Sequence, residues 1–335
     1  MKCKFVLNQS MYNGSQASAT HLVPVVVTPN RQLTSLAYIF ILLFGMLLPA
    51  LSHAQQQSDL YLGDVNFWHA KPISNLKKIT DTPAYTNQPY FFSSNALYFT
   101  EMLTNDGVQQ TDIFKLNLPK LDTHNFTQSP ESEYSPTPLP KGKGMSVIRV
   151  NAQGKQELWR LDASGGAVEH LVPAIEPVGY QVWINEHELL LFVLGEPNTL
   201  QRVDTRLGKE KGVVIDTNIG ASLYQFNRSV WFLYSHTQDA NVLKAYNAKT
   251  NKTMVVGNLP DAASYFSVSA TGDIITSNGE SLFHQKLFQK GGKLQVQSSW
   301  RKIDVPEVAC KSGVSRTAIS HFGDKIVLVC PRVAP

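Results

Sequence analysis

Polar and aromatic side chains that could form a binding site gather in three short stretches of the chain. They are Tyr85, Asn87, Gln88, Glu131, Glu133, Tyr134, Tyr180 and Gln181. Amide and phenol groups around one opening suit a peptide or a sugar, and the two glutamates could hold a ligand or a cation. The alternative is that these residues only fill turns and begin strands, with the tyrosines packing between neighbouring sheets.

No motif in the sequence marks any of these side chains as catalytic. There is no Gly-x-Ser-x-Gly nucleophile elbow. The run Lys141-Gly142-Lys143-Gly144 lacks the spacing and the strand-to-helix context of a phosphate-binding loop. The histidines are scattered along the chain and are not paired as in a zinc helix. We therefore predict a binding protein that is not an enzyme and has no cofactor or bound metal.

The elements that must position the candidate residues belong to a repeated unit. One apolar strand position recurs in steps of 39 to 53 residues, at Leu60, Ile113, Leu158, Leu200, Leu243 and Leu282. A second series of runs rich in branched and aromatic residues follows short turns such as Ser94-Asn95 and Thr271-Gly272-Asp273. About four short antiparallel strands in about 45 residues is the period of a β-propeller blade.

Six first strands can be placed, and each would lie innermost in its blade. They start near Gln88, Pro136, Tyr180, Ser222, Ser264 and Thr317. The sixth unit stops after its second strand, at Cys330, and its missing strands are found at residues 59–64 and 76–80. The sequence therefore predicts an all-β fold, a six-bladed β-propeller whose ring is closed by N-terminal strands completing the C-terminal blade. Residues 55–335 would form this single domain.

The first 54 residues have the pattern of a secretory leader. Three basic residues precede or flank an uncharged apolar run over residues 36–51, which ends at Ser52-His53-Ala54. The alternative is an uncleaved membrane anchor, because the run is near the short limit for spanning a bilayer. Either way, we expect a periplasmic or secreted protein that contacts the membrane only through an uncleaved leader.

Charge and cysteine usage restrict the partners. Of the 30 Lys and Arg residues, three fall in the leader, so the remainder nearly balances 26 acidic residues. Nucleic acid is therefore not an expected partner, because phosphate binding needs a clustered excess of positive charge. Cys310 and Cys330 remain after the leader, and in an oxidising compartment we expect them to form a disulfide. We expect a monomer.

The blades resemble those of TolB-type propellers, the periplasmic WD-like repeat family. The resemblance lies in residues 79–89, in Thr111-Asp112-Ile113-Phe114, and in residues 131–136 with the turn Pro140-Lys141-Gly142-Lys143. It implies an exported six-bladed propeller that recognises other molecules without covalent chemistry. TolB itself carries an α/β domain ahead of its propeller, whereas here the ring-closing strand begins close to the predicted cleavage site.

The leading functional hypothesis is a propeller that binds a protein or peptide in the cell envelope. The polar segment 101–111 is predicted to be a long loop and a plausible contact for that partner. One alternative is a metal-dependent hydrolase or lactonase of the six-bladed type, with carboxylates converging on the axis. Another is a carbohydrate-binding module that uses Tyr85, Tyr134 and Tyr180.

Overall fold

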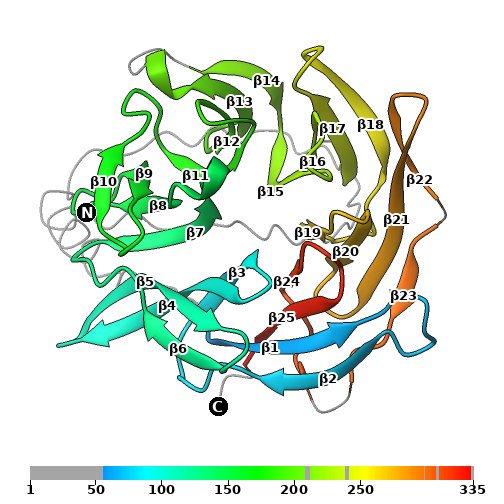
Figure 1. Ribbon diagram of the computed structural model, residues 1–335, viewed down its shortest axis with the longest axis horizontal. Helices are drawn as coiled ribbons and strands as arrows, with labels where there is room; N and C mark the ends of the chain where they lie inside the picture. Colours follow the sequence, from blue (N-terminus) through cyan, green and yellow to red (C-terminus); the bar gives the residue numbers. More distant parts are fainter. Residues whose placement is uncertain (1–55, 208–211, 238–240, 298, 307–308, 333–335) are drawn as a thin grey trace, which may run out of the picture. The chain divides into compact units, whose positions relative to one another are not determined.

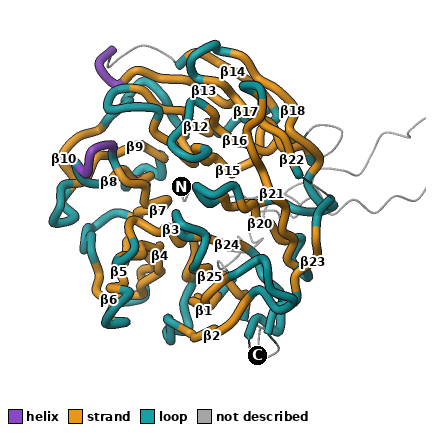
Figure 2. Tube along the Cα trace, turned by 45° about the vertical axis from the view of Figure 1, so that its right-hand side comes forward, coloured by secondary structure: helices purple, strands orange, loops and turns teal. Residues whose placement is uncertain are grey.

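The computed structural model describes residues 56–207, 212–237, 241–297, 299–306 and 309–332, and the predicted leader lies outside them. Within these ranges nearly all regular structure is strand (Figure 2). The helices there are two single turns of 3₁₀ type, η1 (Pro140–Gly142) and η2 (Thr205–Leu207). No helix in the described ranges is long and apolar enough to cross a membrane.

The strands form six antiparallel sheets arranged as the blades of a propeller (Figure 1). Blades 1 to 5 follow the chain from residue 86 onward, and blade 6 joins its two ends. The innermost strands, from blade 1 to blade 6, are β3 (Thr86–Ser93), β7 (Ser132–Pro138), β11 (Val178–Trp183), β15 (Ile219–Gln225), β19 (Tyr265–Val268) and β24 (Arg316–Ile319).

The second strands are the runs of branched and aromatic residues that the sequence indicated. They are β4 (Ala96–Asn105), β8 (Met145–Val150), β12 (Glu188–Val193), β16 (Trp231–His236), β20 (Asp273–Ser277) and β25 (Lys325–Pro331). The predicted turns precede them, and in one of these turns Gly272 takes the positive φ of 89° that glycine tolerates best. The hairpin prediction is confirmed.

The third strands carry the apolar position whose recurrence revealed the repeat. The middle of a blade is covered on both faces by its neighbours, so the residue at this position is 0% exposed in every blade. The six residues are Leu60, Ile113, Leu158, Leu200, Leu243 and Leu282. The third strands are β5 (Val108–Asn117), β9 (Gln156–Leu161), β13 (Thr199–Asp204), β17 (Val242–Asn247), β21 (Leu282–Lys290) and β1 (Ser58–Val65).

The outer strands depart from the prediction in blade 5. There β21 is long enough to pair with β22 at one end and with β23 at the other, so two short strands share the outer place. The outer strands are β6 (Asp122–Asn125), β10 (Ala167–His170), β14 (Val213–Thr217), β18 (Lys252–Asn258), β22 (Lys293–Val296), β23 (Arg301–Ile303) and β2 (Ile73–Lys78).

The ring closes as the sequence predicted. In blade 6, β1 pairs with β25 from Ser58 to Asp64, with Leu60 opposite Val329 and Gly63 opposite Ile326. The blue and red ends of the chain therefore share one sheet (Figure 1). A disulfide joins Cys310, which precedes β24, to Cys330 in β25. The closing strands and the bridge together fix the position of β24.

The polar segment 101–111 is not a loop, so this part of the prediction is wrong. β4 and β5 stay paired as far as Asn105 opposite Val108, and a two-residue turn joins them. In that turn Asp106 has a φ of 50° and Gly107 a φ of 76°, as the primed hairpin turns require. Glu101 is also buried. The Asp-Gly pair was the signal for a hairpin, and the polar composition concealed it.

The hydrophobic core lies between the blades and not within any one of them. Between blades 6 and 1, for example, Leu60 and Val329 pack with Leu97 and Phe99. Further clusters join blade 1 to blade 2 and blade 4 to blade 5. A single sheet buries its faces only against its neighbours, so the ring is the folding unit and the inner strands are held at a fixed spacing around the axis.

Candidate functional site

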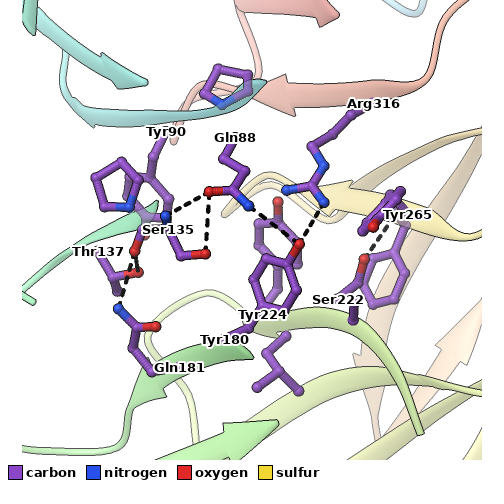
Figure 3. A pocket seen from close by; sticks show the side chains of 15 residues that line it. Gln88, Tyr90, Ser135, Thr137, Tyr180, Gln181, Ser222, Tyr224, Tyr265 and Arg316 are labelled. Carbon is purple, nitrogen blue, oxygen red and sulfur yellow. Dashed lines mark hydrogen bonds between the residues drawn. The ribbon is translucent and has the colours of Figure 1, made fainter. Parts of the chain in front are cut away.

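A cavity of about 70 Å³ lies on the axis of the propeller (Figure 3). The innermost strand of every blade contributes to its wall. Its lining residues are Gln88, Pro89, Tyr90, Ser135, Pro136, Thr137, Tyr180, Gln181, Ala221, Ser222, Leu223, Tyr224, Tyr265, Phe266 and Arg316. The cavity takes a few water molecules or one small chemical group, so it could receive the end of a larger ligand.

Backbone irregularities aim several of these side chains at the axis. The register of β3, β7, β11 and β15 shifts beside the cavity, whereas β19 and β24 pair without a shift. At two of the shifts Gln88 and Ser135 have positive φ, 54° and 56°. Non-glycine residues rarely adopt this conformation, and a bulge re-aims side chains. Both residues precede a proline, which leaves no N–H for the ladder at the shift.

On one side of the cavity, glutamine and serine groups join three blades. Gln88 Oε1 accepts hydrogen bonds from the Ser135 backbone N–H at 2.6 Å and from the Thr100 hydroxyl at 3.2 Å. Gln181 Nε2 donates to the backbone oxygens of Ser135 and Ser146 at 3.1 and 3.2 Å. The Oε1 atom of Gln181 is buried and has no hydrogen-bond partner among the described residues. This side is therefore rigid and carries one unfilled acceptor.

On the other side, Arg316 reaches across the axis from blade 6 to blade 3. Its Nη2 donates to the Tyr180 hydroxyl at 2.8 Å, and its guanidinium stacks 3.8 Å from the ring centre of Tyr265. The Nε of Arg316 is buried without a hydrogen-bond partner among the described residues, whereas the residue as a whole is partly exposed. No Asp or Glu in the described ranges lies within 4.0 Å of it, the salt-bridge distance.

Three of the tyrosines around Arg316 are held neutral by burial. Burial raises the pKa of the hydroxyls of Tyr85, Tyr224 and Tyr265 well above the ordinary value for tyrosine, and the nearby charge of Arg316 only partly opposes this. The phenols therefore supply hydrogen bonds and ring faces, but no negative charge. The positive charge of Arg316 is left without an opposite charge from the residues around it.

The structure brings together some of the predicted site residues. Gln88, Tyr180 and Gln181 line the cavity. Tyr85 lies just outside the lining, near enough to Arg316 for the charge to act on its pKa. Asn87 points to its own backbone, where its Oδ1 accepts the Gln88 N–H at 2.7 Å. Tyr134 is buried in β7 with 7% of its surface exposed.

Glu131 and Glu133 lie away from the cavity lining, at the junction of blades 1 and 2. Both face Arg149, whose Nε lies 2.6 Å from Glu131 Oε2 and 3.3 Å from Glu133 Oε1. The guanidinium of Arg149 also stacks 5.3 Å from the ring of Trp159. Burial raises the pKa of Glu133 to about 7, against the opposing hydrogen bond from Ser129. The positive charge beside the two glutamates is therefore Arg149 and not a bound cation.

The sequence interpretation missed Arg316, Tyr224 and Tyr265. Their positions were within reach, because the predicted inner strands of blades 4, 5 and 6 start at Ser222, Ser264 and Thr317. Applying the strand-start argument of blades 1 to 3 to the other half of the ring would have found these residues. Neither the cavity lining nor any other described part of the chain holds three His, Cys, Asp or Glu residues grouped as metal ligands.

The sequence matches no protein-family model and no curated protein. Solved structures do resemble it. A protein described as TolB from Agrobacterium tumefaciens superposes with a TM-score of 0.60 at 10% identity, over 83% of this chain and 99% of that one. TolB from Acinetobacter baumannii gives a TM-score of 0.50 at 10% identity, over 82% of this chain and 63% of that one.

The chain has the TolB-like propeller fold.

Enzymes share this TolB-like architecture. A protein described as a gluconolactonase gives a TM-score of 0.51 at 13% identity, over 77% of this chain and 92% of that one. A puromycin hydrolase mutant gives 0.50 at 10% identity, over 82% and 51%. At such identities the likeness concerns the fold alone, so function must be argued from the site.

Proposed function

We propose that this TolB-like propeller is a non-catalytic protein of the cell envelope that binds a protein or peptide partner at the axial cavity. The observation that carries the proposal is the axial cavity itself, whose wall combines hydrogen-bonding groups, aromatic rings and the guanidinium of Arg316. All six innermost strands contribute to that wall, so one ligand there would contact every blade. A peptide offers both N–H donors and C=O acceptors to such a wall.

The lining also favours binding over catalysis. It contains no Asp, Glu, His, Cys or Lys among the described residues that form it. A metal-dependent lactonase would need carboxylates on the axis, and the axis here carries a guanidinium. Of the three tyrosines expected for a carbohydrate-binding module, Tyr134 is buried and does not line the cavity. A peptide needs hydrogen-bonding groups and aromatic surface, and these the wall supplies.

Cross-linking and peptide selection test the proposal. A photo-reactive amino acid placed at Tyr90 or Tyr224 should cross-link a peptide that is selected from a random display library on the immobilised protein. The same group at Val255, exposed on β18, should not. Ala221→Trp, which fills the cavity from β15, should abolish binding of the selected peptides, and Val255→Trp should leave it unchanged.

Selected peptides that bind Ala221→Trp as tightly as the natural protein would overturn the proposal. So would cross-links from Val255 equal to those from the cavity wall. Circular dichroism and the unfolding temperature of each variant establish that the comparison is made between folded proteins.

A further inference from the structure

Resting on the proposed function, we infer that Arg316 is the binding site for a carboxylate group of the bound peptide. The carboxylate belongs either to the C-terminus of the peptide or to an Asp or Glu side chain. The inference starts from a difference among the arginines of the chain. Arg149, Arg202 and Arg332 have side chains that are 12 to 25% exposed, and each forms a salt bridge with a carboxylate of this chain.

Arg316 is enclosed by the same kinds of groups but lacks the carboxylate. It has a hydroxyl partner in Tyr180 and a ring partner in Tyr265, as Arg202 has the Tyr246 hydroxyl and Arg149 has the Trp159 ring. Taking an arginine out of water without an opposite charge is costly. Since arginine stays protonated in proteins, it cannot relieve that cost by losing a proton.

The neighbouring tyrosines do not replace the missing charge. Tyr180 accepts a hydrogen bond from Nη2, and Gln88 Nε2 donates to the same hydroxyl at 3.4 Å. These contacts fix the position of the guanidinium in the cavity wall, and the residue stays partly exposed. A positioned cation that has no carboxylate partner, in a wall that a ligand can reach, is an anion site.

The wall selects a carboxylate over a phosphate. Among the described residues that line the cavity, Arg316 is the one Lys or Arg, so a phosphate that carries close to two negative charges would keep one of them uncompensated against aromatic rings. A carboxylate carries one charge, and its planar shape matches the guanidinium. The cavity of about 70 Å³ also accommodates the smaller group.

The test compares acid and amide forms of one peptide. A peptide selected on the immobilised protein is synthesised with a C-terminal carboxylate, with a C-terminal amide, and with each Asp or Glu replaced by Asn or Gln. Loss of the recognised carboxylate should weaken binding by about 30-fold, because hydrogen bonds to charged groups contribute more than neutral ones. The form that loses affinity identifies whether the carboxylate is terminal or from a side chain.

Two variants and one competition experiment assign the effect to Arg316. Arg316→Met should bind the acid and amide forms equally, and Arg316→Lys should keep part of the preference. On the unmodified protein, N-acetylglycine should compete with the peptide, whereas N-acetylglycinamide should not. Inorganic phosphate at equal concentration should compete more weakly than N-acetylglycine.

Equal affinity for every acid and amide form would overturn the carboxylate inference, while the peptide binding itself would still support the proposed function. A preference for the acid that survives in Arg316→Met would also overturn it. Failure to select any peptide that depends on the cavity would instead overturn the proposed function, so the two failures are distinguishable.

Discussion

Arg149 and Arg316 occupy two regions of the ring that differ in one respect. Both guanidiniums stack on an aromatic ring, of Trp159 in one case and of Tyr265 in the other. Arg149 faces two carboxylates at the junction of blades 1 and 2, and Arg316 faces none on the axis. One region therefore pairs its arginine with carboxyl groups of the chain, and the other leaves its arginine without one.

The comparison separates structural pairing from binding. Where the chain supplies both partners of an ion pair, the pair holds two blades together, and removing one partner leaves the other buried and unpaired. Where the chain supplies only the cation, the unpaired charge lowers the free energy of unfolding, and a ligand can supply the missing negative charge. Stability measurements should distinguish these roles without knowledge of the ligand.

The largest effect is expected for Arg149→Met. This change removes the guanidinium that faces Glu131 and Glu133 and leaves both carboxyl groups without their cation. The free energy of unfolding should then fall by about 3 to 5 kcal/mol, the cost of breaking one partner out of a buried ion pair. Urea unfolding followed by tryptophan fluorescence measures this.

Arg316→Met is the matched control. It also removes a cation, but no carboxylate of the described residues loses a partner. Its free energy of unfolding should equal or exceed that of the natural protein. A loss as large as that of Arg149→Met would mean that both arginines are structural, and the contrast between the two regions would disappear.

A somewhat smaller effect is expected when the disulfide is removed. The bridge spans 20 residues and flanks β24, the strand that carries Arg316. Cys310→Ser with Cys330→Ser should lower the free energy of unfolding by about 3 kcal/mol. Because β24 loses one of its anchors, peptide affinity should fall too, whereas the cluster around Arg149 should be unaffected. Unchanged affinity in the double variant would show that the sheet alone positions Arg316.

The smallest effect is the pH dependence that Glu133 contributes. Its pKa is about 7 in the folded protein, against an ordinary value of 4.5, so folding favours the protonated form. That contribution is complete below pH 4.5 and is lost as the pH rises through 7. Between pH 5 and pH 8 the free energy of unfolding should therefore drop by about 2 kcal/mol.

Glu133→Gln should remove this slope, since the amide cannot titrate. Urea unfolding of both proteins at several pH values provides the comparison. The same slope in Glu133→Gln would assign the titration to another group.

The fold could be predicted because its signals are local and repeated. The apolar position marked by Leu60 and Ile113 recurs in every blade, and each hairpin has its own turn residues. The half-blades at the two ends then left one way to close the ring. The shared outer place of β22 and β23 was not predictable, because both are short and their pairing depends on the length of β21.

The site was only partly predictable. Gln88, Tyr180 and Gln181 follow from the starts of the inner strands. Glu131 and Glu133 also lie at the start of an inner strand, but both form ion pairs with Arg149 and do not face the cavity. The sequence alone does not show which charged side chains pair. The bulges at Gln88 and Ser135 are a matter of backbone register, which no residue pattern revealed.

The register of β1 against β25 also sets an order of assembly. Each of blades 1 to 5 is built from neighbouring segments and can pair as it leaves the ribosome or a translocation channel. The edge of β1 must wait for a partner that is synthesised almost last, across the longest loop that the chain closes. A product shortened before β25 keeps that edge open to strands of other molecules. Pairing of β25 with β1 thus covers the open edge, and only chains that include β25 can complete the ring.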